Sequence, residues 1–226
     1  MYEPPDYEKV EREQWKRAQK EVAKEARSPT SRLLERVATF ISRFGYPKKA
    51  VLEKIRKDSM FAAHFAKEPR RTGLHEAVAA EWIQALPYVR EFEVLSKGGA
   101  NAVKVTSDGN LETGSKGKTL PGKSLDFRWT TGDTTFYAMH KYTKQGGGNQ
   151  DSQYQEMIEL MKRFHHCRDT GVVLVVIVDG EYYQEKDAAR LSELQRHQRT
   201  IAPKSYALSI GELPGVLEEY YGVGEC

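Results

Sequence analysis

The spacing of apolar positions predicts that the first part of the chain is helical. Residues 28–31, Ser-Pro-Thr-Ser, form a helix-start signature, because Ser and Thr side chains accept hydrogen bonds from free backbone N–H groups. Apolar residues then recur at helical spacing, namely Leu33, Leu34, Val37, Ile41 and Phe44. Residues 45–47 (Gly-Tyr-Pro) end this helix, and a second helical pattern runs from Val51 to Phe61. The highly charged residues 7–27 favour a solvated helix or arm.

Strands enter the pattern after one more helix. Residues 72–86 predict a helix whose apolar face is formed by Leu74, Val78, Trp82 and Leu86. Residues 90–95 alternate between polar and apolar as a strand does, and residues 97–122 predict a long loop or an irregular hairpin. Beyond them the order is strand, strand, helix, strand, helix, strand and helix, at residues 124–130, 134–143, 149–167, 172–178, 187–198, 205–210 and 213–221.

The unbroken apolar run from Val172 to Val178 is typical of a central strand that is covered on both faces. Together the elements predict an α/β fold with a mixed central β-sheet flanked by helices, and with an added helical N-terminal region. We therefore expect a helical region at residues 1–70 and an α/β core at residues 71–226.

Composition narrows the class of protein further. The 226 residues are 39% hydrophobic and 30% charged, which excludes wholesale disorder. No run approaches the roughly 20 apolar residues of a membrane helix, and the polar start does not resemble a secretory signal. Two cysteines, Cys167 and Cys226, do not suggest a disulfide framework, so we expect a cytoplasmic protein. The net charge of +3 permits a nucleic-acid partner without demanding one.

Two neighbouring apolar strands each carry one charged residue of possible chemical importance. Asp126 lies in the first strand of the predicted hairpin, and Lys141 lies in the second. A carboxylate in an apolar strand is unfavourable unless it is paired or binds a cation. The two side chains therefore form either a buried ion pair or a metal-dependent phosphodiesterase site. In the second case Asp126 would hold Mg²⁺, and Lys141 would neutralise the phosphate or help to position the attacking water.

At these residues the chain resembles the PD-(D/E)XK nuclease superfamily and, within it, type II restriction endonucleases. Leu125-Asp126 stands where the family has Pro-Asp, and Met139-His140-Lys141 stands where it has (Asp/Glu)-X-Lys. The flanking order of elements agrees over about residues 70 to 215, including an upstream helix that carries Glu76. The resemblance implies a restriction-endonuclease-like core and Mg²⁺-dependent hydrolysis of double-stranded DNA at a short sequence, leaving 5′-phosphate and 3′-hydroxyl ends.

The chain departs from the family at Met139, which stands in place of the second acidic ligand. Mg²⁺ prefers hard oxygen donors, so a thioether is a poor substitute. One explanation is that the second acidic ligand has moved to Glu156 on the following helix, as in some restriction enzymes. Another is that Glu76 and Asp126 bind the metal together with the backbone carbonyl of His140 and water. A third explanation is an inactive form. Strand alternation directs the His140 side chain away from Lys141, which favours a packed histidine over a catalytic base.

The glycine-rich residues 144–153 follow the Lys141 strand and open a helix. The simpler interpretation is a flexible linker that ends in a helix cap at Asn149 or Asp151. However, glycines allow a backbone to approach a ligand closely, and amide side chains read adenine in the major groove. Restriction enzymes that the chain resembles contact bases through similar segments. The candidate DNA-binding residues are Lys144, Gln145, Asn149, Gln150, Asp151 and Gln153, with Lys118 and Lys123 as candidates for phosphate contacts.

The resemblance also implies a homodimer, because two-fold symmetry matches a palindromic site. The helical residues 1–70 are then an arm, a dimer contact or a DNA contact. Two alternatives stay open: a non-sequence-specific or repair nuclease of the same fold, and a DNA-binding protein on a catalytically decayed nuclease fold, which Met139 favours.

Overall fold

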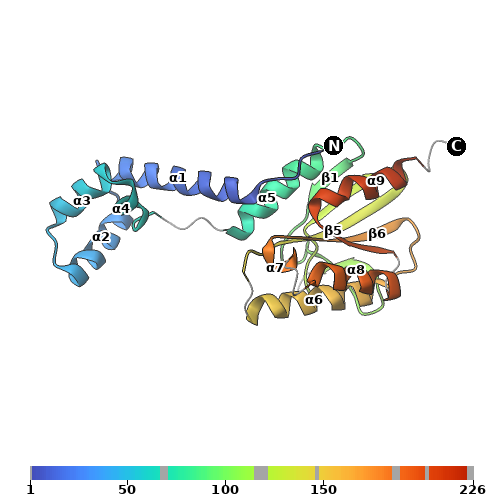
Figure 1. Cartoon of the computed structure of the whole chain (residues 1–226). Coiled ribbons are helices and arrows are strands. Elements are labelled where there is room, and N and C mark those ends of the chain that lie inside the picture. Colours follow the sequence, from blue (N-terminus) through green and yellow to red (C-terminus); the bar gives the residue numbers. More distant parts are fainter. Residues whose placement is uncertain are drawn as a thin grey trace. The chain divides into compact units, whose positions relative to one another are not determined.

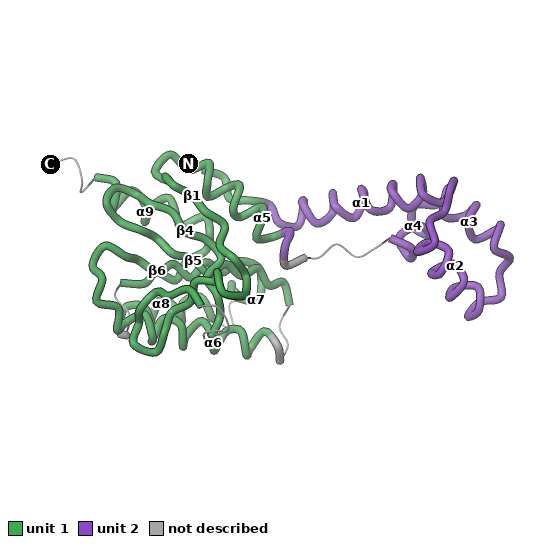
Figure 2. Tube along the Cα trace, turned by 180° about the vertical axis from the view of Figure 1, so that it is seen from behind, with its two compact units in different colours: residues 1–5, 75–226 green, residues 6–74 purple. Residues whose placement is uncertain are grey.

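A computed structural model describes residues 2–66, 71–114, 122–145, 148–184, 189–201 and 204–222. The chain forms two compact units (Figure 2): a helical unit, Asp6–Leu74, and an α/β unit made of Met1–Pro5 and His75–Cys226. Among the described residues, no helix combines the length and the apolar character that crossing a membrane requires.

The described part of the helical unit, up to residue 66, contains four helices: α1 (Tyr7–Glu25), α2 (Ser31–Phe44), α3 (Lys48–Lys57) and α4 (Ser59–Ala63). Three of them begin at side-chain caps, since Asp6, Thr30 and Asp58 accept hydrogen bonds from the backbone N–H groups of Lys9, Leu33 and Phe61. Asp58 also separates α3 from α4, which the apolar spacing had joined in one pattern. Gly45 ends α2 in the left-handed conformation, with a φ of 74°.

A small core holds these helices together. Its buried residues come from α1 to α4 and the turns beside them, and they are Val22, Ala26, Leu33, Val37, Val51, Ile55, Ala62, Phe65 and Ala66. Val22 lies on α1, so this highly charged helix is not a wholly solvated arm. The guanidinium of Arg36 donates to the backbone oxygens of Phe65 and Ala66, which closes the end of α4 against α2.

The α/β unit is built on a five-stranded mixed sheet in the order β1-β4-β5-β6-β7. The strands are β1 (Arg90–Val94), β4 (Phe127–Thr131), β5 (Thr134–Tyr142), β6 (Val172–Asp179) and β7 (Ser205–Leu208). The first three run antiparallel to one another, while β5, β6 and β7 are parallel. Every residue of β6 is buried, as its unbroken apolar run predicted. The expected α/β class with a mixed central sheet flanked by helices is confirmed.

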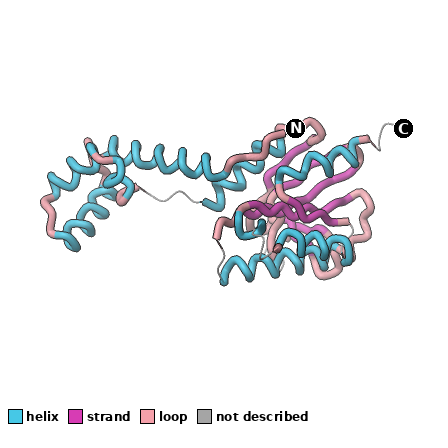
Figure 3. The backbone as a smooth tube through the Cα atoms, viewed as in Figure 1, coloured by secondary structure: helices cyan, strands magenta, loops and turns pink. Residues whose placement is uncertain are grey.

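Helices cover both faces of this sheet (Figures 1 and 3). α6 (Gly148–Phe164) and α8 (Arg190–Ile201) pack on one face, over Met139 and the even-numbered residues of β6. α5 (Arg71–Gln84) and α9 (Leu213–Tyr221) pack on the other, over Phe136, Ala138 and the odd-numbered residues of β6. Within the expected long loop, β2 (Val103–Val105) and β3 (Leu111–Thr113) form a short antiparallel hairpin.

The buried face of α5 differs from the predicted one. Its most buried side chains are those of His75, Glu76, Ala79, Ala80 and Ile83, whereas Val78 and Trp82 are half-buried. The prediction followed the largest apolar residues, but small alanines face the sheet because they allow a helix to approach it closely. As a result, two polar residues near the start of α5 are buried, and one of them is Glu76.

Candidate active site

The four residues predicted to act in catalysis come from four different segments. Asp126 immediately precedes β4, Lys141 lies near the end of β5, Glu76 lies on α5 and Glu156 lies on α6. Because β4 and β5 are antiparallel, the start of β4 lies beside the carboxyl end of β5. In α/β proteins, ligands bind at the carboxyl ends of the parallel strands, so this end of the sheet is the place to look for a site.

Asp126 is buried, and hydrogen bonds from two sides fix its position. Its backbone N–H donates to the oxygen of Ala138 on β5, and its backbone oxygen accepts from the N–H of Leu95 after β1. The residue is 7% exposed, and Oδ2 of its carboxylate accepts a hydrogen bond from the backbone N–H of His140 at 2.9 Å. The side chain is therefore oriented against the strand that carries Lys141.

Lys141 is half-buried, two residues beyond Met139 on β5. Strand alternation gives the two residues the same face of the sheet, the one covered by α6. Among the described residues, Lys141 forms no ion pair with Asp126, whose side chain accepts from the His140 N–H. The simpler explanation of the two charges, a buried ion pair, therefore does not account for them.

Glu76 is buried near the start of α5, with 9% of its side chain exposed. Its Oε2 is ion-paired with the ammonium of Lys97, in the segment that follows β1. The backbone oxygen of Lys97 in turn accepts a hydrogen bond from the hydroxyl of Ser124 at 2.9 Å. Ser124 is two residues from Asp126, so the segment that carries Lys97 contacts both α5 and the segment that carries Asp126.

Glu156 lies on the exposed side of α6. Its Oε2 is 3.2 Å from the ammonium of Lys123, which is three residues before Asp126. Both side chains of this pair are about half exposed, at 50% and 44%. The contact joins α6 to the segment that carries Asp126, on the same face of the sheet as Lys141. Lys123, a predicted phosphate contact, is thus engaged with a predicted catalytic carboxylate.

The donor types in this neighbourhood suit Mg²⁺, since three carboxylates and the carbonyl of His140 are all hard oxygen ligands. Their arrangement is not that of a formed metal centre. Within the described ranges, no three His, Cys, Asp or Glu side chains gather closely enough to hold a metal ion. Two of the carboxylates have a lysine as their cation instead, Lys97 at Glu76 and Lys123 at Glu156.

Met139 and His140 pack into opposite sides of the sheet. Met139 is 2% exposed and belongs to the apolar cluster beneath α6. The His140 ring is 1% exposed and lies 6.2 Å from the ring of Phe127, on the face covered by α5. The expected orientation of the His140 side chain, away from Lys141, is confirmed. Its ring is a packed group, whereas its backbone N–H donates to Asp126.

Asp179 was not identified from the sequence, although it borders the same site. It ends β6, is 6% exposed, and accepts a hydrogen bond from the backbone N–H of Ile210 at 3.1 Å. Its other oxygen lies 3.6 Å from Nε2 of His140. Close by, the rings of His75 and Tyr142 are 4.3 Å apart, which brings the start of α5 to the end of β5. A polar residue directly after a long apolar strand was the available signal for Asp179.

Asp151, a predicted base contact, is engaged within the chain. Its Oδ1 accepts a hydrogen bond from the hydroxyl of Tyr182 at 2.5 Å and lies 3.7 Å from the guanidinium of Arg190. Tyr182 belongs to the short helix α7 (Glu181–Gln184), and the Arg190 guanidinium sits over its ring at 3.9 Å. Burial, together with the hydrogen bond to Asp151, raises the pKa of Tyr182 to about 12. The phenol therefore stays protonated at neutral pH and orients Asp151.

The other predicted DNA contacts lie at the start of α6 and just before it. Lys144 and Gln145 are exposed, while Gln150 and Gln153 are half-buried. Lys118 and the side chain of Asn149 lie outside the described residues.

Comparisons with known proteins add little to this picture. No protein-family model and no curated protein sequence matches the chain. The crystal structure of protein VC1899 from Vibrio cholerae is similar to the whole chain with 11% identity and a TM-score of 0.36. The chain spans 59% of the length of that protein.

Proposed function

We propose that this chain is a Mg²⁺-dependent type II restriction endonuclease that cuts double-stranded DNA at a short specific sequence. The observation that carries the proposal is the set of contacts around Asp126. The N–H of His140 donates to Asp126 itself, Lys97 contacts both Glu76 and Ser124, and Lys123 pairs with Glu156, where Ser124 and Lys123 lie two and three residues before Asp126. These are the residues that resemble the catalytic motif of the PD-(D/E)XK superfamily, on a mixed sheet of the expected class.

In this proposal Asp126 is the principal ligand of Mg²⁺, and Glu76, Glu156 and the carbonyl of His140 complete the oxygen donors. The metal would polarise the scissile phosphate and acidify water. Lys141 would neutralise the phosphate or help to position the attacking water. Glu76 and Glu156 are paired with Lys97 and Lys123, so these ion pairs would have to open for the two carboxylates to hold a divalent cation.

Plasmid cleavage in the presence of Mg²⁺ tests the proposal, with Asp126→Ala and Lys141→Ala beside the wild type. We expect the wild type to give discrete fragments with 5′-phosphate ends that share one sequence, and both variants to be inactive. Retained cutting by Asp126→Ala would overturn the assigned site. Fragments without a common end sequence would favour a non-sequence-specific or repair nuclease of the same fold.

A DNA-binding protein on a decayed nuclease fold is the second candidate. Met139 favours it, because a core-packed thioether occupies the position of the second acidic ligand. If the wild type binds DNA but cuts it with neither Mg²⁺ nor Mn²⁺, this candidate prevails. In both cases the partners would be double-stranded DNA and a second copy of the chain, in the cytoplasm.

A further inference from the structure

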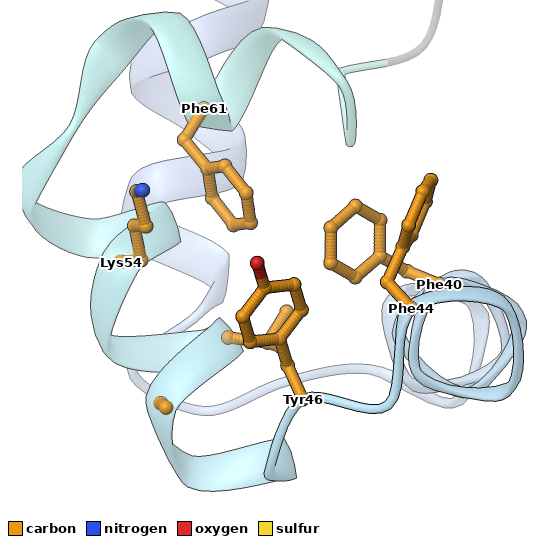
Figure 4. Close-up of a pocket in the computed structure, with 7 residues that line it drawn as sticks. Phe40, Phe44, Tyr46, Lys54 and Phe61 are labelled. Atoms are coloured by element: carbon orange, nitrogen blue, oxygen red, sulfur yellow. The ribbon is translucent and has the colours of Figure 1, made fainter.

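An aromatic pocket lies within the helical unit, and it is lined by none of the residues of the candidate active site. It has a volume of about 460 Å³ and is lined by Phe40, Phe44, Tyr46, Ala50, Val51, Lys54 and Phe61 (Figure 4). Small-molecule pockets in proteins range from roughly 300 to 1,000 Å³. The size therefore suits one planar ring system with its substituents.

Two of the pocket's rings are exposed although they are large and apolar. Phe44 is 54% exposed and Tyr46 is 56% exposed. The ring of Phe40 joins them, with its centroid 4.6 Å from that of Phe44 and 6.2 Å from that of Tyr46. The Phe40 and Tyr46 planes are inclined by only 22°, and Phe61 meets Phe40 edge-on at 86°. Figure 4 shows these rings turned toward a common space.

The helix α3, which supplies part of the pocket lining, carries several lysines. Lys54 lines it, with its ammonium 5.1 Å from the centroid of the Phe61 ring. Lys48 and Lys49 directly precede the lining residue Ala50 on α3 and are exposed. The segment 6–74 carries 18 Lys and Arg against 10 Asp and Glu, whereas the rest of the chain carries 17 against 22. The basic charge of the protein is thus concentrated in the helical unit.

We infer that this pocket binds an unstacked nucleobase of a single-stranded or locally opened nucleic acid. Aromatic faces accept any base by stacking, and nearby cations hold the phosphates on either side of it. A second copy of the same surface fits less well, because two basic helical units repel each other. The inference goes beyond the proposed cleavage of duplex DNA, and it holds whether or not the α/β unit cuts.

Fluorescence anisotropy with the full-length chain tests this inference in EDTA, where metal-dependent cleavage does not interfere. The probes are a labelled oligothymidine and an abasic oligonucleotide of the same length. We expect Phe44→Ala and Tyr46→Ala each to weaken binding of oligothymidine about tenfold, since stacking on one base is typically worth roughly that factor or more. Binding of the abasic strand is expected to stay unchanged. The matched control is Met60→Ala, an 82% exposed side chain outside the pocket, which is expected to bind both strands as the wild type does.

Charge is tested separately with Lys54→Gln and, as the control on α1, Lys20→Gln. Lys54→Gln is expected to reduce the slope of log affinity against log salt by about 0.7, the value for one phosphate contact of a single strand. Equal losses on both strands in the aromatic variants would overturn the inference, as would wild-type affinity in those variants or no binding by the wild type. A dimer that Tyr46→Ala dissociates without any change in DNA binding would overturn it in favour of a second copy.

Discussion

The backbone N–H of His140 donates a hydrogen bond of 2.9 Å to Oδ2 of Asp126. This contact joins a buried carboxylate to the strand that carries Lys141. Among the described residues, Oδ1 of the same carboxylate accepts no hydrogen bond. Because the donor is a backbone group, it persists when the side chain of residue 126 is changed. One oxygen of Asp126 is therefore held in place, and no ion pair within the described ranges neutralises the charge of its carboxylate.

Asp126→Asn separates the charge of this residue from its structural contact. An asparagine oxygen still accepts from the His140 N–H, so we expect a melting temperature close to that of the wild type. Cleavage in Mg²⁺ is expected to fall about a thousandfold or more, because an amide is a poor replacement for an anionic metal ligand. Plasmid cleavage rates and thermal melts measure the two effects.

The matched control is Asp133→Asn, an exposed aspartate in the turn between β4 and β5, which is expected to cut at the wild-type rate. An Asp126→Asn variant that cuts normally would remove Asp126 from the mechanism.

Lys97→Met tests whether the lysine at Glu76 stands in for a metal. The substitution removes the ammonium group and leaves Glu76, whose side chain is 9% exposed, without its cation. We expect the free energy of unfolding to fall by about 2 kcal/mol in EDTA. Ca²⁺ is expected to raise the melting temperature more in Lys97→Met than in the wild type, since metal binding no longer competes with the lysine.

Lys57→Met is the control for this experiment, because its partner Glu53 forms an exposed ion pair at 2.7 Å on α3. That variant is expected to show the same Ca²⁺ response as the wild type. An identical Ca²⁺ response in Lys97→Met would mean that Glu76 does not bind the cation.

The sequence predicted the strands of the sheet, but it did not predict the side-chain contacts of the candidate site. Periodicity located the sheet, because β6 is apolar from Val172 to Val178 and β4 and β5 flank a Gly-Asp turn. It could not find the lysine partners of Glu76 and Glu156, since Lys97 and Lys123 lie in segments without a regular pattern. The predicted buried face of α5 was wrong for a related reason. Alanines carry little weight in a hydrophobic pattern, yet they allow the close approach that buries Glu76.

The raised pKa of Tyr182 predicts a dependence of stability on alkaline pH. The phenol has a pKa of about 12 in the folded chain against an ordinary value of 10.0, because burial and the Asp151 carboxylate disfavour the phenolate. The neutral form is therefore favoured by folding. Its contribution is complete below pH 10 and is lost as the pH rises toward 12.

Tyr182→Phe isolates this contribution, because it removes the ionisable group and keeps the ring. We expect the difference in unfolding free energy between wild type and Tyr182→Phe to decrease between pH 10 and pH 12, as measured by urea unfolding at each pH. A difference that stays constant over this range would show that Tyr182 does not titrate with folding.

Met139→Glu tests which explanation of the family departure is correct. It restores the residue type that the PD-(D/E)XK pattern has at this position, but the side chain is 2% exposed and lies among apolar residues beneath α6. We expect the free energy of unfolding to fall by about 3 kcal/mol or more, because an uncompensated carboxylate would be buried. Neither cleavage nor the Ca²⁺-induced rise in melting temperature is expected to increase.

Met139→Leu, the control of similar volume, is expected to lose less than about 1.5 kcal/mol of unfolding free energy and to keep its cleavage rate. These results would favour a second carboxylate supplied from elsewhere, by Glu156 or by Glu76, over a restored ligand at position 139. A stable Met139→Glu variant with new or faster Mg²⁺-dependent cutting would instead identify the natural chain as a decayed nuclease that has lost its second acidic ligand.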